Sequence, residues 1–258
     1  MDLDLTGKSV LITGGSKGIG LACATVFLQE GCSVVLVSRD AAVLETAAAS
    51  LKHLGPVATC AADLSQGNER ERLHSLHPDV DILVNNAGAA WGADFDEFPE
   101  SGWDKVMTLN LKTPFFLTKA LAPMLRAAAS VEKPAKVINI ASIDGIFVNP
   151  LETYSYAASK SGLIHLTRRM AVRLIKDHVV VAAIAPGPFK SDMNKAARDN
   201  ADEVSTRVPA GRIGTDEDMA GAAIYLASRA GDYVVGATIA VDGGIVYANP
   251  GIPGDGWD

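Results

Sequence analysis

A tyrosine and a lysine four positions apart, Tyr156 and Lys160, form the pair in this sequence best suited to proton transfer. They fall in a stretch with helical character, so their side chains share one face, about one turn apart. A free tyrosine has a pKa near 10, and a cation within about 4–6 Å lowers that pKa by favouring the phenolate. We therefore expect Lys160 to lower the pKa of Tyr156 and to make it an acid/base catalyst near neutral pH.

A serine near the pair helps to decide between a catalytic role and the alternative, a surface pair on an amphipathic helix. Ser142 follows the apolar run Lys136–Ile140, and α/β proteins bind ligands at the carboxyl ends of their strands. Its position favours the catalytic interpretation. Tyr154 lies roughly 120° around the helix from Lys160, so we expect it to pack at the rim of a pocket.

A glycine-rich segment, Thr13–Gly20 (TGGSKGIG), joins the first strand-like run to an alanine-rich helical stretch. Glycines allow a tight turn and let backbone N–H groups approach a pyrophosphate at a helix N-terminus, where the helix dipole favours anions. Any left-handed turn or close strand–helix contact also uses glycine, so this alternative stays open. The position between a first strand and a first helix favours dinucleotide binding.

Short β-branched runs alternate with longer helical stretches, and most of the runs are apolar throughout. This is typical of strands covered by helices on both faces of a parallel sheet. The alternation predicts a single-domain, doubly wound Rossmann fold of the α/β class with a mostly parallel seven-stranded sheet. The expected strands are Ser9–Thr13, Ser33–Val37, Val57–Ala61, Ile82–Val84, Lys136–Ile140, Val179–Ile184 and Thr238–Val241. The expected helices are Leu21–Glu30, Ala41–Leu54, Gly102–Ala129, Tyr154–Lys176 and Asp216–Ala227.

Two segments fit neither pattern. Residues 188–214 are rich in charged and small side chains, and a connection this long predicts a lid over a functional site. Residues 249–258 are rich in proline and glycine and are expected to form an irregular arm. We see no linker, so residues 1–258 are expected to form one domain.

The composition excludes several classes of protein. A formal net charge of −7 without clustered Lys or Arg argues against a nucleic-acid partner. No apolar run approaches the roughly 20 residues needed to cross a bilayer, and the acidic segment Met1–Asp4 is unlike a secretory signal. Cys23, Cys32 and Cys60 lack metal-ligand spacing, so we expect no metal site and interpret them as buried, reduced thiols of a cytoplasmic protein.

The glycine spacing, TGxxxGxG, resembles that of the short-chain dehydrogenase/reductase family, and further motifs follow in the family's order over nearly the whole chain. They are Asn85-Asn86-Ala87-Gly88, Asn110, Ser142, the YxxxK motif of Tyr156 and Lys160, and Pro186-Gly187. The segments NNAGAAWGA and ESGWDKVMTLN look most like the 3-oxoacyl (β-ketoacyl) reductase branch, which includes rhamnolipid-type reductases.

The resemblance implies roles for the catalytic residues. Tyr156 protonates the substrate oxygen, Ser142 hydrogen-bonds that oxygen, and Lys160 also holds the nicotinamide ribose. Asn110 anchors a water in a proton relay, or it is a structural side chain at a helix kink. Ser142 and Tyr156 are fourteen positions apart, one more than is commonest in the family, so we expect residues 143–153 to bulge outward and shape the substrate pocket.

The resemblance also implies a set of cofactor-binding residues. They are Gly14, Ser16, Lys17, Gly18, Ile19, Ser38, Arg39, Asp63, Leu64, Asn86, Ala87, Gly88, Tyr156, Lys160, Pro186, Gly187, Phe189 and Ser191. Asp63 has an alternative role as the N-cap of the next helix. Ser191 stands where the family usually has threonine, so the hydroxyl is kept.

The residues after the second strand predict NADP(H) as the cofactor. NAD sites typically place there an acidic residue that accepts from the ribose 2′-OH, but this chain has Ser38 followed by Arg39. Both can donate to a 2′-phosphate, and Lys17 is placed beside the same phosphate by the resemblance. Asp40 is expected to point away as the N-cap of the following helix. The alternative is that the basic residues are only solvated.

The expected substrate is a small-molecule ketone of hydrophobic character. Candidate lining residues, each of which could instead belong to the core, are Trp91, Ile143, Phe147, Tyr154, Phe189 and Met193. We therefore expect an NADPH-dependent carbonyl reductase, with 3-oxoacyl thioesters as the leading substrate class. One alternative is a dehydrogenase of a secondary alcohol, polyol or steroid. Another is a dinucleotide-binding redox sensor without turnover, which the presence of Ser142, Tyr156 and Lys160 disfavours.

The two long helical stretches predict an oligomer. Residues 102–129 and 154–176 carry more apolar side chains than a helix with one buried face needs. The family commonly pairs these helices across a dimer axis and then doubles again, so we expect a homotetramer or homodimer.

Overall fold

Seven strands form the central sheet in the order β3-β2-β1-β4-β5-β6-β7, and each neighbouring pair is parallel. The computed structural model describes residues 2–76 and 79–249. The strands are β1 (Ser9–Thr13), β2 (Ser33–Ser38), β3 (Val57–Ala61), β4 (Ile82–Asn85), β5 (Ala135–Ile140), β6 (Val179–Pro186) and β7 (Thr238–Val241). This confirms the doubly wound, seven-stranded sheet predicted from the sequence.

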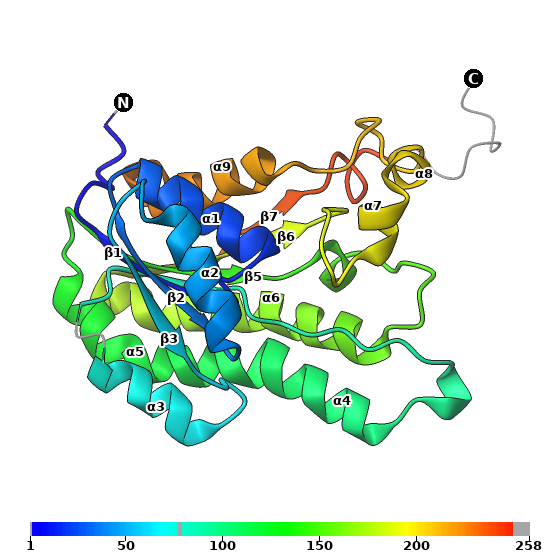
Figure 1. The fold of residues 1–258 in the computed structure, drawn as a ribbon, viewed down its shortest axis with the longest axis horizontal. Coiled ribbons are helices and arrows are strands. Elements are labelled where there is room, and N and C mark those ends of the chain that lie inside the picture. The colour runs from blue at the N-terminus through cyan, green and yellow to red at the C-terminus, as the bar shows by residue number, and fades with distance from the viewer. Residues whose placement is uncertain (1, 77–78, 250–258) are drawn as a thin grey trace.

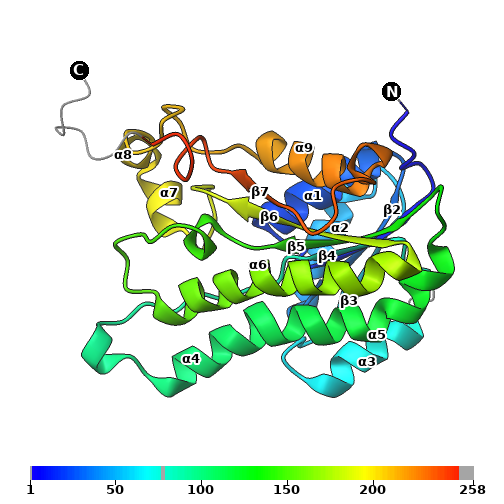
Figure 2. The same ribbon diagram turned by 180° about the vertical axis from the view of Figure 1, so that it is seen from behind.

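Helices cover both faces of the sheet (Figures 1 and 2). On one face lie α1, α2 and α9, and on the other lie α3, α4, α5 and α6. The helices are α1 (Gly18–Gln29), α2 (Ala41–Leu51), α3 (Gly67–Leu76), α4 (Glu100–Met107), α5 (Thr113–Ala128), α6 (Tyr154–Leu174), α7 (Lys195–Asp199), α8 (Ala201–Ser205) and α9 (Asp216–Ala227). No helix within the described residues is long and apolar enough to span a membrane.

Strand β1 shows why the sheet is buried on both faces. Successive side chains of a strand point to opposite faces, and here both sets are apolar. Ile12 belongs to the core cluster that contains Phe27 of α1. Leu11 belongs to the other cluster, with Leu121 of α5. Each face of the strand therefore has its own helical layer, and the polar strand ends are left to form a site.

The prediction of one regular α-helix over Gly102–Ala129 is wrong for the middle of that range. A π-helix, Thr108–Lys112, separates α4 from α5. Apolar periodicity does not reveal a π turn, and the one buried residue of this turn is the polar Asn110. Helix α3 was not predicted, since only Arg70 and Leu73 of this largely polar segment are buried.

The segment 188–214 is a loop whose two ends meet. Phe189 forms a parallel bridge with Gly214, and the Gly214 N–H donates to the Pro188 carbonyl at 2.9 Å. Helices α7 and α8 lie within it, beside the loop that follows β5 (Figures 1 and 2). The predicted arm, apart from Asn249, lies outside the described residues.

Candidate active site

Three predicted catalytic residues meet at the carboxyl end of β5. Ser142 follows the end of the strand, and Tyr156 and Lys160 lie in the first turns of α6. The Lys160 ammonium lies 5.5 Å from the centre of the Tyr156 ring. It donates to the Ile140 carbonyl at 2.7 Å, so the last residue of β5 anchors it. Lys160 is only 4% exposed and Ser142 is also buried, whereas Tyr156 is half-buried.

The expected effect of Lys160 on the Tyr156 pKa is wrong in this structure. Burial raises the pKa of Tyr156 to about 12, although the Ser142 hydroxyl opposes the rise through a hydrogen bond. Burial also lowers the pKa of Lys160 to about 8. The physical reason is that desolvation acts on both groups while the ammonium is directed at the Ile140 carbonyl. Tyr156 is therefore a neutral phenol near pH 7, which suits it to donate a proton.

Asn110 lies in the π-helix, and protein atoms occupy both of its amide N–H groups. Its Nδ2 donates to the Ala89 carbonyl at 2.9 Å and to the Ser159 hydroxyl at 3.0 Å. Its Oδ1 accepts from the Ala89 N–H at 2.8 Å. These contacts support the structural alternative for the side chain, because they tie the segment after β4 to α6.

The glycine turn depends on glycine at two positions. A Cβ on Gly20 would lie 2.3 Å from the Gly14 carbonyl oxygen, and a Cβ on Gly14 would lie 2.9 Å from the amide nitrogen of Asn86. Asn86 donates from Nδ2 to the carbonyls of Thr13 and Gly14 at 2.9 and 3.0 Å. The Thr13 hydroxyl accepts from the backbone N–H of Ala87 at 2.9 Å. The predicted Asn86 and Ala87 thus hold the turn in shape.

The start of α1 leaves room for an anion. The helix begins at Gly18, whose φ is +53°, and the nearest atom to an added Cβ would be the Ser191 Cβ at 3.9 Å. Backbone N–H groups at a helix start attract phosphate. Ile19 packs partly against the core. The turn therefore fits the pyrophosphate of a dinucleotide, with the loop that carries Ser191 above it.

The residues after β2 and β3 form the side predicted to hold adenosine. The Ser16 and Ser38 hydroxyl groups lie 3.4 Å apart. Burial raises the pKa of Asp63, but hydrogen bonds from Ser65 and the charge of Arg39 outweigh it and leave that pKa below its ordinary value. Arg39 is therefore close enough to act on Asp63.

The two predicted N-caps have different outcomes. Asp40 caps α2, as predicted, and accepts from the Val43 N–H at 3.1 Å. Asp63 instead accepts from the Ser65 N–H at 3.1 Å, within a turn. Since α3 begins only at Gly67, the N-cap alternative for Asp63 is wrong. The neighbouring Leu64 is fixed through its carbonyl, which accepts from Arg70 and Thr113.

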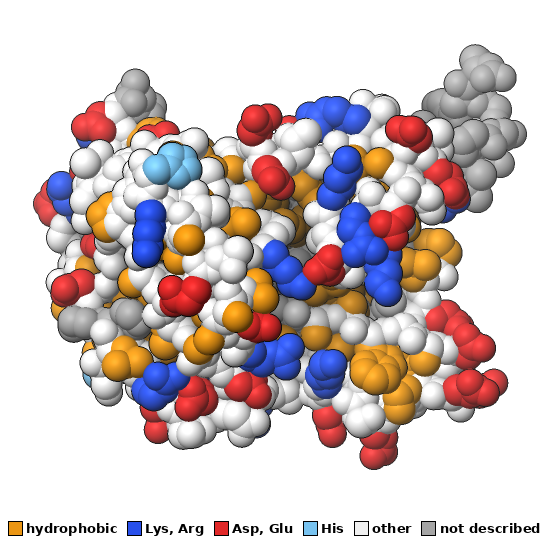
Figure 3. Space-filling model, viewed as in Figure 1, with side chains coloured by type: hydrophobic (Ala, Val, Ile, Leu, Met, Phe, Trp, Pro, Cys, Tyr) orange, Lys and Arg blue, Asp and Glu red, His pale blue; other side chains and the backbone are white. Residues whose placement is uncertain are grey.

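The two cations predicted to meet a 2′-phosphate differ in their partners. Lys17 forms an ion pair with Asp192 of the segment 188–214 at 2.5 Å, and Arg198 shares that carboxylate. Arg39 is exposed and has no ion pair within the described residues. Figure 3 shows the face of the molecule seen in Figure 1, where Lys and Arg side chains, mixed with Asp and Glu, surround a hollow near the middle.

The segment after β6 reaches back to the glycine turn. A Cβ on Gly187, which follows Pro186, would lie 2.7 Å from the Asp242 Cα, so the backbone passes close to β7 here. Phe189 is buried in the core, so the core alternative holds for its side chain. The Ser191 hydroxyl accepts from the Asn194 N–H at 3.0 Å.

Gly88 links the cofactor side to the catalytic residues. A Cβ there would lie 3.2 Å from the Asn110 Oδ1 and 3.8 Å from the Lys160 Nζ. Glycine therefore keeps the chain after β4 close to the lysine.

Some of the candidate pocket residues are packed against neighbouring side chains, and others are exposed. Trp91 packs on Gly102, and Tyr154 packs edge-to-face against Phe95 and Phe98 at 5.6 Å between ring centres. Ile143 is buried. Phe147 and Met193, in contrast, are 40% and 48% exposed. Three further apolar side chains in the loop that carries Phe147 are exposed, and they were not predicted from the sequence. They are Ile146, Val148 and Leu151. An apolar rim of this kind leaves no periodic signal.

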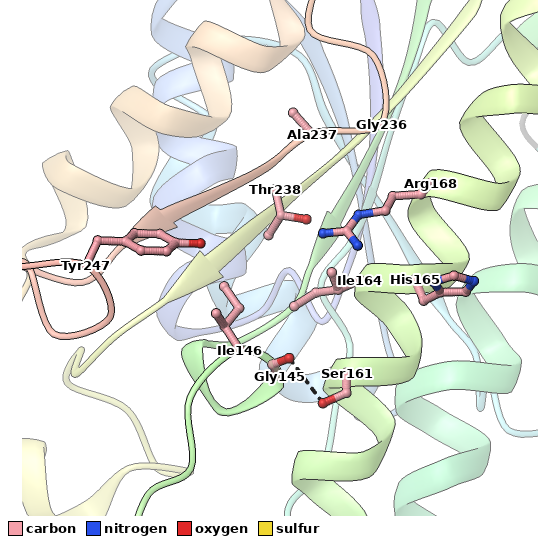
Figure 4. Close-up of a pocket in the computed structure, with 10 residues that line it drawn as sticks. All are labelled: Gly145, Ile146, Ser161, Ile164, His165, Arg168, Gly236, Ala237, Thr238 and Tyr247. Carbon is pink, nitrogen blue, oxygen red and sulfur yellow. Dashed lines mark hydrogen bonds between the residues drawn. The ribbon is translucent and has the colours of Figure 1, made fainter.

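No group of three or more His, Cys, Asp or Glu side chains within residues 2–76 and 79–249 could hold a metal ion. A surface pocket of about 320 Å³ is lined by Gly145 and Ile146 of the segment after Ser142, by α6, by the start of β7 and by Tyr247 (Figure 4).

The fold and this site define a class of protein. A family model described as "Enoyl-(Acyl carrier protein) reductase" matches residues 14–246. The chain belongs to this family, which is part of the short-chain dehydrogenase/reductase oxidoreductases.

Individual relatives cover nearly the whole chain. It is 42% identical over 247 residues to the rhamnolipids biosynthesis 3-oxoacyl-(acyl-carrier-protein) reductase of Pseudomonas aeruginosa, over 93% of this chain and 96% of that one. It is 37% identical over 247 residues to the 2-dehydro-3-deoxy-D-gluconate 5-dehydrogenase of Dickeya dadantii, with the same two coverages. The active-site complex of Pseudomonas aeruginosa RhlG with NADP superposes with a TM-score of 0.90 at 42% identity, over 94% of this chain and 98% of that one.

Replacing Tyr156 by phenylalanine tests its role as the proton donor. The Tyr156→Phe variant keeps the ring but loses the transferable proton, so kcat should fall by about 10²–10⁴-fold with cofactor affinity nearly unchanged. Steady-state kinetics and cofactor titration measure the two quantities. Tyr154→Phe is the matched control and should be mild, since the Tyr154 hydroxyl bonds the Glu152 carboxylate and not Ser142 or Lys160 in the part of the chain that the structure describes. Retention of more than about a tenth of wild-type turnover by Tyr156→Phe would contradict the assignment.

The pKa values predict the pH dependence of ketone reduction. Lys160 is charged below its pKa of about 8 and neutral above it, while Tyr156, with a pKa of about 12, keeps its proton throughout this range. If the Lys160 charge stabilises the developing phenolate, kcat/KM should fall as the pH rises through about 8. A profile measured from about pH 6 to about pH 10 that stays flat would contradict this role.

Proposed function

We propose that the protein is an NADPH-dependent carbonyl reductase that acts on a small-molecule ketone. The observation that carries the proposal is the meeting of Ser142, a neutral Tyr156 and a buried Lys160 at the carboxyl end of β5. Ser142 hydrogen-bonds the substrate oxygen, Tyr156 gives that oxygen its proton, and the Lys160 charge stabilises the phenolate that remains. NADPH, when bound, supplies the hydride to the carbonyl carbon.

The cofactor site is built from backbone at one end and from cations at the other. The glycine turn takes the pyrophosphate, while Ser38, Arg39 and Lys17 take the 2′-phosphate. The other assigned positions line the path between them, namely Asp63, Leu64, Asn86, Ala87, Gly88, Pro186, Gly187, Phe189 and Ser191. The NADP in the complex of the Pseudomonas aeruginosa relative supports NADP(H) as the cofactor.

The leading substrate class is a 3-oxoacyl thioester. The name of the Pseudomonas aeruginosa relative supports this class. The exposed apolar side chains of the loops after β5 and β6 also support it, because apolar surface favours an acyl chain; they are Phe147, Val148, Leu151 and Met193.

A second candidate function is the oxidation of a sugar acid or polyol. The name of the Dickeya dadantii relative favours it. A panel of 3-oxoacyl thioesters with NADPH, and of polyols and sugar acids with NADP⁺, separates the two by kcat/KM. A redox sensor without turnover is disfavoured by the assembled catalytic residues.

Further parts of the proposal concern the surroundings of the site. The segment 188–214 closes over the bound cofactor and substrate, and Asn110 contributes to a proton relay in addition to its structural bonds.

The protein is also proposed to be cytoplasmic. Cys23, Cys32 and Cys60 are free and buried, which fits a reducing cytoplasm.

A double variant tests the cofactor preference. Wild type should favour NADPH over NADH by about 10²-fold in kcat/KM, since charge-assisted contacts to the 2′-phosphate contribute roughly 1.5–3 kcal/mol each. Ser38→Asp combined with Arg39→Ile should reverse the preference, because the new carboxylate accepts from a ribose hydroxyl and repels a phosphate. A wild type that prefers NADH would defeat the roles given to Lys17 and Arg39.

We further propose that the chain forms a homodimer or homotetramer through α4, α5 and α6. Large apolar side chains on these helices are exposed, namely Trp103, Phe115, Phe116 and Val172. Burial of such a patch stabilises an interface. Sedimentation velocity at micromolar concentration should show a dimer or tetramer, and a monomer would rule the interface out. Phe115→Asp combined with Val172→Asp should shift the protein toward monomer.

A further inference from the structure

A carboxylate that the proposed reaction does not use lies in the catalytic turn. Asp144 is the middle residue of the 3₁₀ turn Ile143–Gly145, two residues after Ser142. Its backbone N–H donates to the Ser142 hydroxyl at 3.2 Å, and the Gly145 N–H donates to the Ser142 carbonyl at 3.0 Å. The turn is therefore wound directly around the catalytic serine.

The same turn is packed against the helix that carries the other catalytic residues. A Cβ on Gly145 would lie 2.7 Å from the backbone carbon of Lys160, so only glycine fits there. The Ser161 hydroxyl donates to the Gly145 carbonyl at 3.1 Å (Figure 4). These contacts hold the backbone of Asp144 between Ser142 and the turn of α6 that carries Lys160.

The Asp144 charge acts on both titrating catalytic groups. After burial, it is the second influence that raises the pKa of Tyr156, and it opposes the fall in the pKa of Lys160. Burial raises the pKa of Asp144 itself, while the Asn149 side chain and the Lys160 charge oppose that rise. Asp144 forms no ion pair within the described chain, so its charge is not neutralised by direct contact.

A carboxylate at this place can affect which substrates bind, because its charge acts on groups of the bound ketone. The Asp144 N–H lies 3.2 Å from the Ser142 hydroxyl, so a ketone oxygen held by that hydroxyl would lie next to the turn, and a substituent of the ketone could extend along it. A carboxylate on that substituent meets a like charge in a partly desolvated site, which costs binding energy that a neutral group does not lose. A neutral ester, thioester or hydroxyl group avoids this repulsion, and a hydroxyl can also donate to Asp144.

We propose that Asp144 is a specificity-determining residue that selects ketones with a neutral group beside the reacting carbonyl and rejects those with a carboxylate there. The inference rests on the proposed carbonyl reductase function and deepens it. It restricts the substrates to esters, thioesters and hydroxyketones in preference to free 3-oxo acids.

The test compares matched pairs that differ only in that charge. Free 3-oxo acids of four to ten carbons and their methyl esters are reduced with NADPH at about pH 8, where an ordinary carboxyl group is ionised. Wild type should favour the ester of each pair. In Asp144→Asn the ester-to-acid ratio of kcat/KM should fall by at least about tenfold, mainly because the acid improves. Asp79→Asn, which removes an exposed charge before the start of β4 and so at the opposite end of the parallel strands from Ser142, should leave the ratio unchanged.

The ratio separates specificity from a structural role. If Asp144→Asn loses activity equally on acid and ester, Asp144 only holds the turn and the inference is overturned. Asp144→Ser is measured in parallel with Asp144→Asn, and NADPH binding by each variant is checked by fluorescence titration. The ester-to-acid ratio is then interpreted for whichever of the two variants retains NADPH binding. Loss of NADPH binding in both variants also marks Asp144 as structural and overturns the inference. A wild type that binds NADPH but reduces none of the substrates, thioesters included, contradicts the proposed function itself.

Discussion

A buried ammonium group organises the catalytic end of this molecule. Lys160 is almost completely enclosed and directs its charge at the carbonyl of Ile140, the last residue of β5. A buried charge without a partner is very costly, so the helix that carries Lys160 must stay docked on the end of that strand. This contact sets the position of Tyr156, one turn earlier on α6, relative to Ser142 beyond the end of β5. Burial lowers the pKa of Lys160, and the nearby charge of Asp144 limits that fall.

Buried polar side chains that are satisfied by hydrogen bonds also occur deeper in the sheet, where they form a network. The Asn85 amide donates to the Thr118 hydroxyl and to the Asn139 side-chain oxygen, and the Asn139 amide donates to the Thr167 hydroxyl at 2.8 Å. This hydrogen-bond network crosses from β4 to β5 and connects α5 with α6. Buried polar groups that are hydrogen-bonded in this way favour one arrangement over its neighbours, because any shift leaves an unpaired group. The geometry of the catalytic residues thus depends on a polar layer as well as on apolar packing.

The sequence predicted the parts of the fold that are repeated and local. Apolar runs predicted the seven strands, and the motif order placed Ser142, Tyr156 and Lys160, which the structure brings together. It did not predict α3, whose few buried side chains leave no apolar pattern. It also did not predict the π turn, in which the buried residue is the polar Asn110, bonded to Ala89 of a distant segment. It also gave the wrong direction for the Tyr156 pKa, since spacing along a helix reveals a neighbouring cation but not the loss of water around both groups. Asp144 was overlooked because its importance comes from the turn around Ser142 rather than from a motif.

The opposite shifts in the pKa values of Tyr156 and Lys160 have one main cause, which is burial. Removing water disfavours the charged form of each group, which raises the pKa of the Tyr156 phenol and lowers that of the Lys160 ammonium. At neutral pH the phenol keeps its proton, and the ammonium is still charged. A neutral phenol beside a cation is arranged to lose a proton only when negative charge develops on a bound oxygen, because the cation then stabilises the phenolate that forms. The neutral phenol is therefore in the protonation state that the proposed carbonyl reduction needs. Oxidation of an alcohol by the same residue would begin from the phenolate, whose formation burial disfavours.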